Sequence, residues 1–150
     1  MLEHDFRSSV GYWLCTSAHI MQRALNEELA PLGITFRQWQ VLAWLAIEGG
    51  VAQNELAERM MIEPATLVTV LDRMEQHGWI QRVPCPGDRR KKLIRATPKA
   101  EPIWNASKPS AQKVREQALR DFSPQEREQL LGYLNRLQVN LNALAAREVG

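Results

Sequence analysis

Apolar residues recur every three to four positions along most of this 150-residue chain, the spacing that places them on one face of a helix. The first series lies between residues 9 and 30 and comprises Val10, Trp13, Leu14, Met21, Leu25 and Leu29. It is interrupted by Ser17 and followed by Pro31 and Gly33, which stop helices. The pattern predicts a long first helix over 9–30.

Two shorter helices are predicted next. Thr35 and Gln38 form a capping-box pattern, which opens a second helix that ends at the pair Gly49–Gly50. Its predicted inward side chains are Trp39, Leu42, Leu45 and Ala46. A third helix over about 53–61 has three apolar residues on one face, namely Leu56, Ala57 and Met60. Ala52 before it is a weak capping residue.

A fourth helix is predicted to begin at Pro64, which suits the first helical position, and to end at about His77 before Gly78. Its apolar face consists of Leu67, Val70, Leu71 and Met74, and its outer face of Ala65, Thr66, Thr69, Asp72, Arg73 and Gln76. Two helices joined by a turn of three residues, the second with an outward polar face, are typical of a helix-turn-helix.

Two β-capable runs, 80–83 and 91–96, follow this helix and are separated by residues 84–90. The segment 82–99 has seven basic side chains and one acidic one, whereas the rest of the chain has 12 basic and 16 acidic residues. The overall net charge of +2 therefore conceals a strongly basic β-ribbon. A helix-turn-helix followed by such a ribbon is a winged helix, and its concentrated positive charge indicates a phosphate backbone as partner.

The remaining sequence predicts two more helices. One runs from Pro98 toward Asp121, with a kink or a break expected near Pro109 because proline removes a backbone donor. Ser123, Pro124 and Glu126 then combine a capping box with proline at the first helical position. The last helix carries a leucine seam at Leu130, Leu134, Leu137, Leu141 and Leu144. This 3.5-residue spacing suits packing against a helix of a second subunit or of the same subunit.

Composition narrows the function classes. The length fits one ordinary domain, and the longest apolar run, 41–47, is too short to cross a bilayer, so a cytoplasmic protein without a membrane partner is expected. Cys15 and Cys85 are expected to be free thiols. No nucleophile–base pairing, phosphate-binding glycine loop or metal cluster is recognisable, so we expect no enzymatic activity, no cofactor and no metal.

Four segments resemble the MarR family of transcriptional regulators: 62–75, 78–82, 88–90 and 96–100. The most specific feature is the spacing from the fourth helix to Asp88-Arg89-Arg90, and the resemblance extends over about 8–147. Cys85 together with 99–102 is similar to the SlyA branch of that family. The implied fold is mainly α with a small β-hairpin wing, a winged helix-turn-helix joined to a helical dimerisation platform.

The resemblance implies a single chain, 1–150, with two functional regions. Residues 8–34 and 98–150 are expected to form the dimerisation region, and 35–97 the DNA-binding region. The implied function is a repressor that binds double-stranded DNA as a homodimer on a pseudo-palindromic operator. Two half-sites about one helical turn apart, ~34 Å, match the two-fold symmetry of such a dimer.

The resemblance also assigns roles to individual residues. On the recognition helix the implied DNA contacts are Ala65, Thr66, Thr69 and Arg73, and on the wing Asp88, Arg89, Arg90 and Lys91. Thr69 stands where many relatives have arginine, and threonine cannot make the two-donor contact to guanine. Further phosphate contacts are expected near helix N-termini at Thr35, Arg37, Gln53 and Asn54, where capping and surface roles are equally compatible with the sequence.

An effector is also implied, because the family often admits small aromatic carboxylates or phenols between the dimer platform and the winged helix. The candidate pocket residues are Trp13, Cys15, His19, Gln22 and Trp39. An equal alternative is that the tryptophans fill a helix junction and His19 has a structural role. At the level of function, the alternative to a ligand-responsive DNA-binding regulator is a winged helix that serves as a protein-interaction module.

Overall fold

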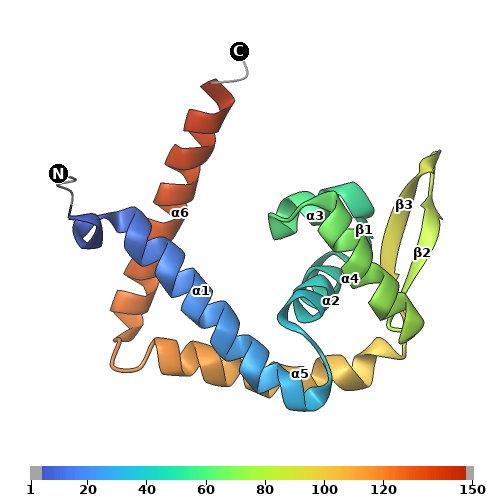
Figure 1. Cartoon of the computed structure of the whole chain (residues 1–150), viewed down its shortest axis with the longest axis horizontal. Helices are drawn as coiled ribbons and strands as arrows, with labels where there is room; N and C mark the ends of the chain where they lie inside the picture. Colours follow the sequence, from blue (N-terminus) through green and yellow to red (C-terminus); the bar gives the residue numbers. More distant parts are fainter. Residues whose placement is uncertain (1–4, 148–150) are drawn as a thin grey trace. The chain divides into compact units, whose positions relative to one another are not determined.

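The computed structural model describes residues 5–147, which are mainly helical and include one small antiparallel sheet (Figure 1). The elements are η1 (Phe6–Ser8), α1 (Val10–Leu29), η2 (Ala30–Leu32), α2 (Phe36–Glu48), β1 (Val51–Ala52), α3 (Gln53–Met60), α4 (Pro64–Gln76), β2 (Ile80–Cys85), β3 (Asp88–Ala96), α5 (Ala100–Ala118) and α6 (Pro124–Arg147). The predicted fold class is confirmed. The described residues form two compact units, which divide between Val114 and Arg115.

The first unit has a continuous hydrophobic core to which α2, α3, α4, the sheet and the end of α1 contribute. Its most deeply buried side chains include Leu29, Ile34, Val41, Leu56, Leu67, Leu71, Met74 and Ile94. Each side chain of this kind contributes about 1.5–3 kcal/mol when it is removed from water. The core fixes α3, α4 and the sheet relative to one another, and these elements carry the DNA-binding residues predicted from the sequence.

The capping box of α2 is confirmed. The Gln38 backbone N–H donates to Thr35 Oγ1 at 3.3 Å, and the Thr35 N–H donates to Gln38 Oε1 at 3.0 Å. The predicted inward face was wrong at Ala46, which is exposed, whereas Val41 is fully buried. Val41 lies one helical turn before Leu45, while Ala46 is rotated about 100° past it and leaves the apolar face.

The helix-turn-helix forms as predicted. The buried face of α3 consists of Leu56, Ala57 and Met60, and that of α4 of Leu67, Leu71 and Met74. The turn between the helices begins with Met61 in the left-handed conformation, φ 52°, and its N–H donates to the Glu58 carbonyl at 3.0 Å. Pro64 occupies the first position of α4, where its missing N–H costs no helical hydrogen bond.

The wing differs from its predicted form in two respects. The strands reach Cys85 and start at Asp88, so the connection is a tight turn at Pro86–Gly87 rather than the predicted loop over 84–90. Gly87 makes this turn possible by adopting φ 86°. Pro84 lies within β2, which tolerates it because β2 is an edge strand in the order β1-β3-β2.

The second difference is an additional strand, β1, in which Val51 pairs with Ile94 and Ala52 with Leu93. The ribbon of β2 and β3 is therefore anchored at its base to the segment between α2 and α3. Beyond that anchor it projects past the helices (Figure 1).

The fifth helix begins at Ala100 rather than Pro98, and it continues through Pro109 as one helix, so the expected break there was wrong. Pro102 falls in the first turn, where backbone N–H groups have no helical partner in any case. In the second unit the Arg127 guanidinium closes the turn into α6, because it donates to Glu116 Oε2 and to the Leu119 carbonyl, both at 3.1 Å.

The capping box that opens α6 is confirmed. The Ser123 N–H donates to Glu126 Oε2 at 2.7 Å, and the Glu126 N–H donates to Ser123 Oγ at 3.2 Å. In the leucine seam Leu130, Leu134 and Leu137 are half-buried, whereas Leu141 and Leu144 are 57% and 58% exposed. The C-terminal half of α6 therefore presents unpartnered apolar side chains.

Candidate nucleic-acid interface

The outer face of α4 is the first part of the candidate interface. The four side chains predicted to contact DNA from this helix, Ala65, Thr66, Thr69 and Arg73, are all exposed. Near the N-terminal end of α4 the side chains on this face are short, because they are alanine and threonine. The Thr69 hydroxyl lies 3.4 Å from the Ala65 carbonyl oxygen of its own helix, a long and therefore weak hydrogen bond.

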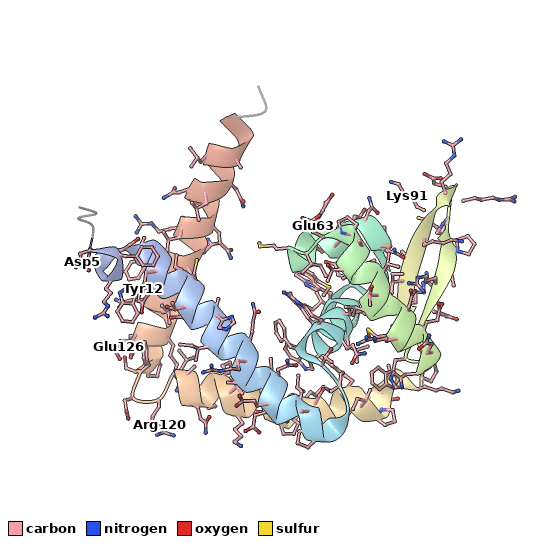
Figure 2. All side chains as sticks on the ribbon, viewed as in Figure 1. Asp5, Tyr12, Glu63, Lys91, Arg120 and Glu126 are labelled. Carbon is pink, nitrogen blue, oxygen red and sulfur yellow. The ribbon has the colours of Figure 1, made fainter. Side chains whose placement is uncertain are left out.

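The wing supplies exposed cations directly after its turn. Asp88, Arg89, Arg90 and Lys91 form the start of β3 rather than a loop tip. The Asp88 carboxylate accepts a hydrogen bond from the Arg90 backbone N–H at 3.0 Å. It therefore shapes the backbone of the turn and leaves both guanidinium groups available. Figure 2 shows Lys91 near the end of the ribbon.

Arg82 has a role that sequence reasoning missed. It lies on β2 with a side chain only 18% exposed, and its guanidinium forms 2.6 Å ion pairs with Asp72 and Glu75 of α4. Its Nε also donates to Gln53 Oε1 of α3 at 3.3 Å. A single arginine therefore connects the wing with both helices of the helix-turn-helix. Asp72 and Glu75 lie on one face of α4, and this acidic pair was the only sequence signal for the role of Arg82. The signal can be recognised only once β2 is known to lie beside that helix.

This arrangement divides the basic segment 82–99 into two groups. Arg82 is neutralised by its two carboxylate partners. The other six basic side chains form no ion pair with any residue in the range 5–147, namely Arg89, Arg90, Lys91, Lys92, Arg95 and Lys99. Unneutralised cations on a projecting ribbon create a local positive potential that attracts polyanions.

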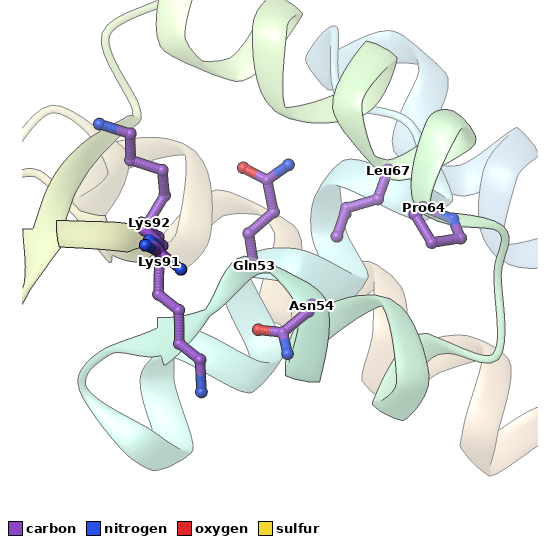
Figure 3. Close-up of a pocket in the computed structure, with 7 residues that line it drawn as sticks. Gln53, Asn54, Pro64, Leu67, Lys91 and Lys92 are labelled. Carbon is purple, nitrogen blue, oxygen red and sulfur yellow. The ribbon is translucent and has the colours of Figure 1, made fainter. Parts of the chain in front are cut away.

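A pocket lies between the wing and the helix-turn-helix (Figure 3). It has a volume of about 280 Å³ and is lined by Gln53, Asn54, Pro64, Leu67, Arg90, Lys91 and Lys92. In Figure 3 Gln53 lies between the strand that carries the two lysines and the helix that carries Pro64 and Leu67. The structure thus brings two of the four predicted phosphate contacts, Gln53 and Asn54, next to predicted wing residues.

The other two predicted phosphate contacts have local partners on α2. Thr35 is the N-cap of that helix, and its hydroxyl accepts the Gln38 N–H. Arg37 donates to Gln40 Oε1 at 3.1 Å and lies over the Phe36 ring, with its Cζ atom 5.4 Å from the ring centroid. Neither residue lines the pocket beside the wing.

Comparison with known proteins identifies the family. The family model described as "MarR family" matches residues 32–91. A MarR-family transcriptional regulator from Rhodococcus sp. RHA1 is 26% identical, with 90% of this chain and 96% of that chain covered and a TM-score of 0.80. A probable transcriptional regulator from Pseudomonas aeruginosa is 30% identical, with 86% and 96% covered and a TM-score of 0.75. The chain belongs to the MarR family.

A further similar structure is that of a MarR protein bound to DNA. A cysteine-to-serine mutant of MarR from E. coli, complexed with operator DNA, is 25% identical, with 90% of this chain and 99% of that chain covered and a TM-score of 0.79. The likeness to these structures extends well beyond residues 32–91, so the flanking helices also follow the MarR-family fold.

The predicted effector residues of this MarR-family chain fall into separate groups. Cys15, His19 and Gln22 are exposed and spaced by four and three residues, so they share one face of α1. Trp13 lies roughly opposite them, since each helical residue adds about 100°. Its indole N–H donates to the Arg7 carbonyl at 2.8 Å, so Trp13 belongs to the N-terminal turn of the chain.

Trp39 lies in an aromatic cluster between α2 and α5. Its ring stacks on Phe36 and on Trp104, with centroid distances of 6.4 and 6.1 Å. Its Nε1 is buried, and no residue within 5–147 accepts a hydrogen bond from it. Trp104 was missed by sequence reasoning because it lies 65 positions away and carries no motif signal.

The described residues were also compared with the expectations about metals, membrane helices and cysteines. No group of three or more histidine, cysteine, aspartate or glutamate side chains over 5–147 is arranged to hold a metal ion. Within the same residues no helix is long and apolar enough to cross a membrane. The prediction that Cys15 and Cys85 are free thiols is confirmed.

Proposed function

We propose that this chain is a sequence-specific, double-stranded DNA-binding repressor that acts as a homodimer on a pseudo-palindromic operator. One observation carries the proposal. The exposed face of α4 and the unneutralised cations of β3 lie on the same winged helix, and Arg82 holds them in a fixed relation. The DNA complex of the E. coli relative supports the same conclusion.

In the proposed complex α4 enters the major groove. Ala65, Thr66 and Thr69 then face base edges, and Arg73, further along the helix, contacts a phosphate. Thr69 offers one hydroxyl and one methyl group, which suit a single hydrogen bond or a thymine methyl rather than a two-donor contact to guanine. Base preference at that position is therefore weaker than an arginine would give.

The wing enters the adjacent minor groove in this proposal. Arg89 or Arg90 inserts its guanidinium, favoured by the enhanced negative potential of narrow A·T-rich minor grooves. Asp88 contributes indirectly, because it fixes the backbone at Arg90. Lys91 adds a further cation near the phosphate backbone.

Homodimer formation is supported by unpartnered apolar side chains outside the winged helix, in the two regions assigned to dimerisation, 8–34 and 98–150. On α1 these are Val10, Ile20 and Met21, and on α6 Leu131, Tyr133, Val139, Leu141 and Leu144. Apolar surface of this extent favours burial against another chain. A two-fold dimer then presents two winged helices to two half-sites.

We further propose that a small aromatic acid or phenol releases the DNA. The buried Trp39 Nε1 lacks an acceptor among the described residues, and such a group costs about 1–3 kcal/mol until it is satisfied. A carboxylate or phenol oxygen at this nitrogen would supply the hydrogen bond, and the Trp39–Trp104 cluster would supply aromatic contact. Cys15, His19 and Gln22 remain candidates on α1, and the SlyA-like branch remains a prediction.

DNA selection tests the main proposal. The purified protein is used to select bound duplexes from a genomic or random library, and binding of the enriched site is measured by fluorescence anisotropy. We expect a palindromic consensus, whose affinity falls when Arg89→Ala is introduced. Enrichment of no sequence, together with capture of a protein partner through the wing, would replace this proposal by the protein-interaction module.

The effector proposal has a separate test. Salicylate and related aromatic acids are titrated into the protein–DNA complex, with cyclohexanecarboxylate as an equally charged, non-aromatic control. We expect the aromatic acids alone to release DNA from the wild type and a Trp39→Phe variant to respond more weakly. Equal release by both kinds of acid would point to a general anion effect.

A further inference from the structure

We propose that the pocket between the wing and the helix-turn-helix is a phosphate site that holds one backbone phosphate of each operator half-site. Lys92 is the cationic ligand added here, and Gln53 and Asn54 supply neutral donors. The inference rests on the proposed DNA-binding function and specifies how the duplex is positioned. It concerns the pocket shown in Figure 3.

The lining chemistry fits an oxyanion. Three cationic side chains of β3, Arg90, Lys91 and Lys92, line the pocket, and none of them is paired with a carboxylate in the range 5–147. Two amide side chains face them from the first turn of α3. Charge-assisted hydrogen bonds from such groups are about twice as strong as neutral ones.

The amide of Gln53 has its oxygen end engaged and its donor end turned elsewhere. Its Oε1 accepts the hydrogen bond from Arg82 Nε at 3.3 Å, and only the oxygen end of the amide can accept from a guanidinium. The NH₂ end is therefore turned away from Arg82. Because the ion pairs with Asp72 and Glu75 hold Arg82 in place, they also help to hold the Gln53 amide with its NH₂ group available for donation.

Backbone N–H groups strengthen this assignment. The first turn of α3 contributes to the lining through Gln53 and Asn54. Its N-cap residue, Ala52, makes no side-chain hydrogen bond to this turn. Unpaired N–H groups at a helix N-terminus favour anions, so this helix end adds to the field of the three cations.

The pocket is large enough to hold a phosphate group. Its volume of about 280 Å³ corresponds to roughly nine water molecules. Five of its seven lining residues carry an amide or a cationic side chain that can bind an oxyanion, and the other two are Pro64 and Leu67.

The position of the pocket indicates that the phosphate belongs to DNA. A major groove and the adjacent minor groove are separated by one sugar–phosphate strand. If α4 occupies the first groove and the wing the second, that strand passes between α4 and β3. The pocket is bounded by these two elements, so it faces the backbone strand that separates the two grooves.

A double-mutant cycle tests this assignment directly. Operator duplexes carry one uncharged methylphosphonate at successive positions, and each is bound by wild type, Lys92→Gln and the control Lys99→Gln, which removes an equal charge outside the pocket. We expect Lys92→Gln to lower operator affinity about tenfold, and we expect this loss to disappear when the methylphosphonate replaces one particular phosphate of each half-site. The reason is that the effects of removing two groups that contact each other are not additive. Lys99→Gln should remain additive at that phosphate.

The salt dependence gives a second readout of the same variants. Removal of one phosphate contact lowers the slope of log affinity against log salt by about one per subunit. We expect this change for Lys92→Gln. If the wild type binds duplexes but the affinity losses from Lys92→Gln and from each methylphosphonate are additive at every position, the phosphate-site inference is overturned and the proposed function is not. A wild type without duplex affinity would overturn the proposed function.

Inorganic phosphate distinguishes a DNA phosphate from a free anion. Backbone amide NMR spectra of the full chain are recorded with phosphate, and with chloride at equal ionic strength as control. Shifts at residues 53–55 that vanish in Lys92→Gln, together with coupling to one operator phosphate, support the proposal. The same shifts without coupling to any operator phosphate would identify a free oxyanion site and overturn the DNA assignment.

Discussion

Arginine residues of similar sequence context have different surroundings in this winged helix. Arg82 is held by Asp72 and Glu75, whereas Arg89 and Arg90 are exposed and form no ion pair with residues of the described range 5–147. In our account the first positions the interface and the other two contact DNA. The local charge of the segment alone does not distinguish these roles.

The positioning role of Arg82 predicts a specific phenotype for Arg82→Gln. The two partner carboxylates are 54% and 44% exposed, so the pairs are screened and their loss should lower the free energy of unfolding by only about 1 kcal/mol. Operator affinity should fall about tenfold because α4 and the wing are no longer held together, equivalent to about 1.4 kcal/mol. Urea denaturation and fluorescence anisotropy measure the two effects.

The salt slope separates positioning from contact. Because Arg82 does not reach a phosphate in our account, Arg82→Gln should leave the slope unchanged, and the equal-charge control Arg120→Gln should leave both affinity and slope unchanged. A slope lowered by about one per subunit would show that Arg82 itself contacts a phosphate.

The wing arginines and Thr69 provide a second test at the residue scale. Arg89→Ala and Arg90→Ala should each cost about 1–3 kcal/mol of operator affinity. Thr69→Ala should cost less, because threonine offers the DNA only one hydroxyl and one methyl group, whereas each wing arginine offers a charged guanidinium. The reverse order, measured on one operator at one salt concentration, would refute the larger share assigned to the wing.

At the scale of elements, strong local signals allowed the sequence to predict most helices. The capping boxes at Thr35 and Ser123 and the proline at the start of α4 marked three helix starts correctly. In contrast, β1 has only two residues, too few for a recognisable period, and pairs with residues about 40 positions away. The same division holds for the candidate site. The exposed face of α4 could be predicted from the periodicity of its apolar residues, whereas the role of Arg82 and the pocket depend on contacts between elements that are distant in sequence.

The tight turn of the wing makes Gly87 a test of element geometry. Gly87→Ala meets no atom within 4 Å, so its effect comes from the backbone at φ 86° and should destabilise by about 1–2 kcal/mol. Asparagine tolerates this conformation better, and Gly87→Asn should therefore be milder. Thermal unfolding checks both variants.

Gly132 provides the matched control for that experiment. It lies inside α6, and a Cβ there also meets no atom within 4 Å. Gly132→Ala should stabilise the protein by about 0.5–1 kcal/mol, because alanine favours a helix. If both alanine variants changed stability in the same direction, backbone conformation would not explain the effect at Gly87.

At the scale of the whole molecule, the proposed function depends on two copies of the chain. Leu141 is 57% exposed on α6, and in the proposed dimer it is buried twice by symmetry. Leu141→Glu should raise the dimer dissociation constant at least tenfold, since each buried leucine contributes about 1.5–3 kcal/mol. Sedimentation equilibrium measures this constant.

The neighbouring residue Asn140 is exposed on the same helix and gives a control of equal charge change. Asn140→Glu should leave the dissociation constant nearly unchanged. An unchanged constant for Leu141→Glu, or an equal rise for both variants, would place the dimer interface away from the leucine seam.

The salt dependence of duplex binding tests the central claim most directly. Affinity for the selected operator and for a scrambled duplex is measured between 50 and 200 mM salt. We predict that operator affinity falls at least about a hundredfold over this range, as expected for several phosphate contacts, and that the operator binds about a thousandfold or more tightly than the scrambled duplex. A protein without salt-sensitive affinity for any duplex would contradict the account.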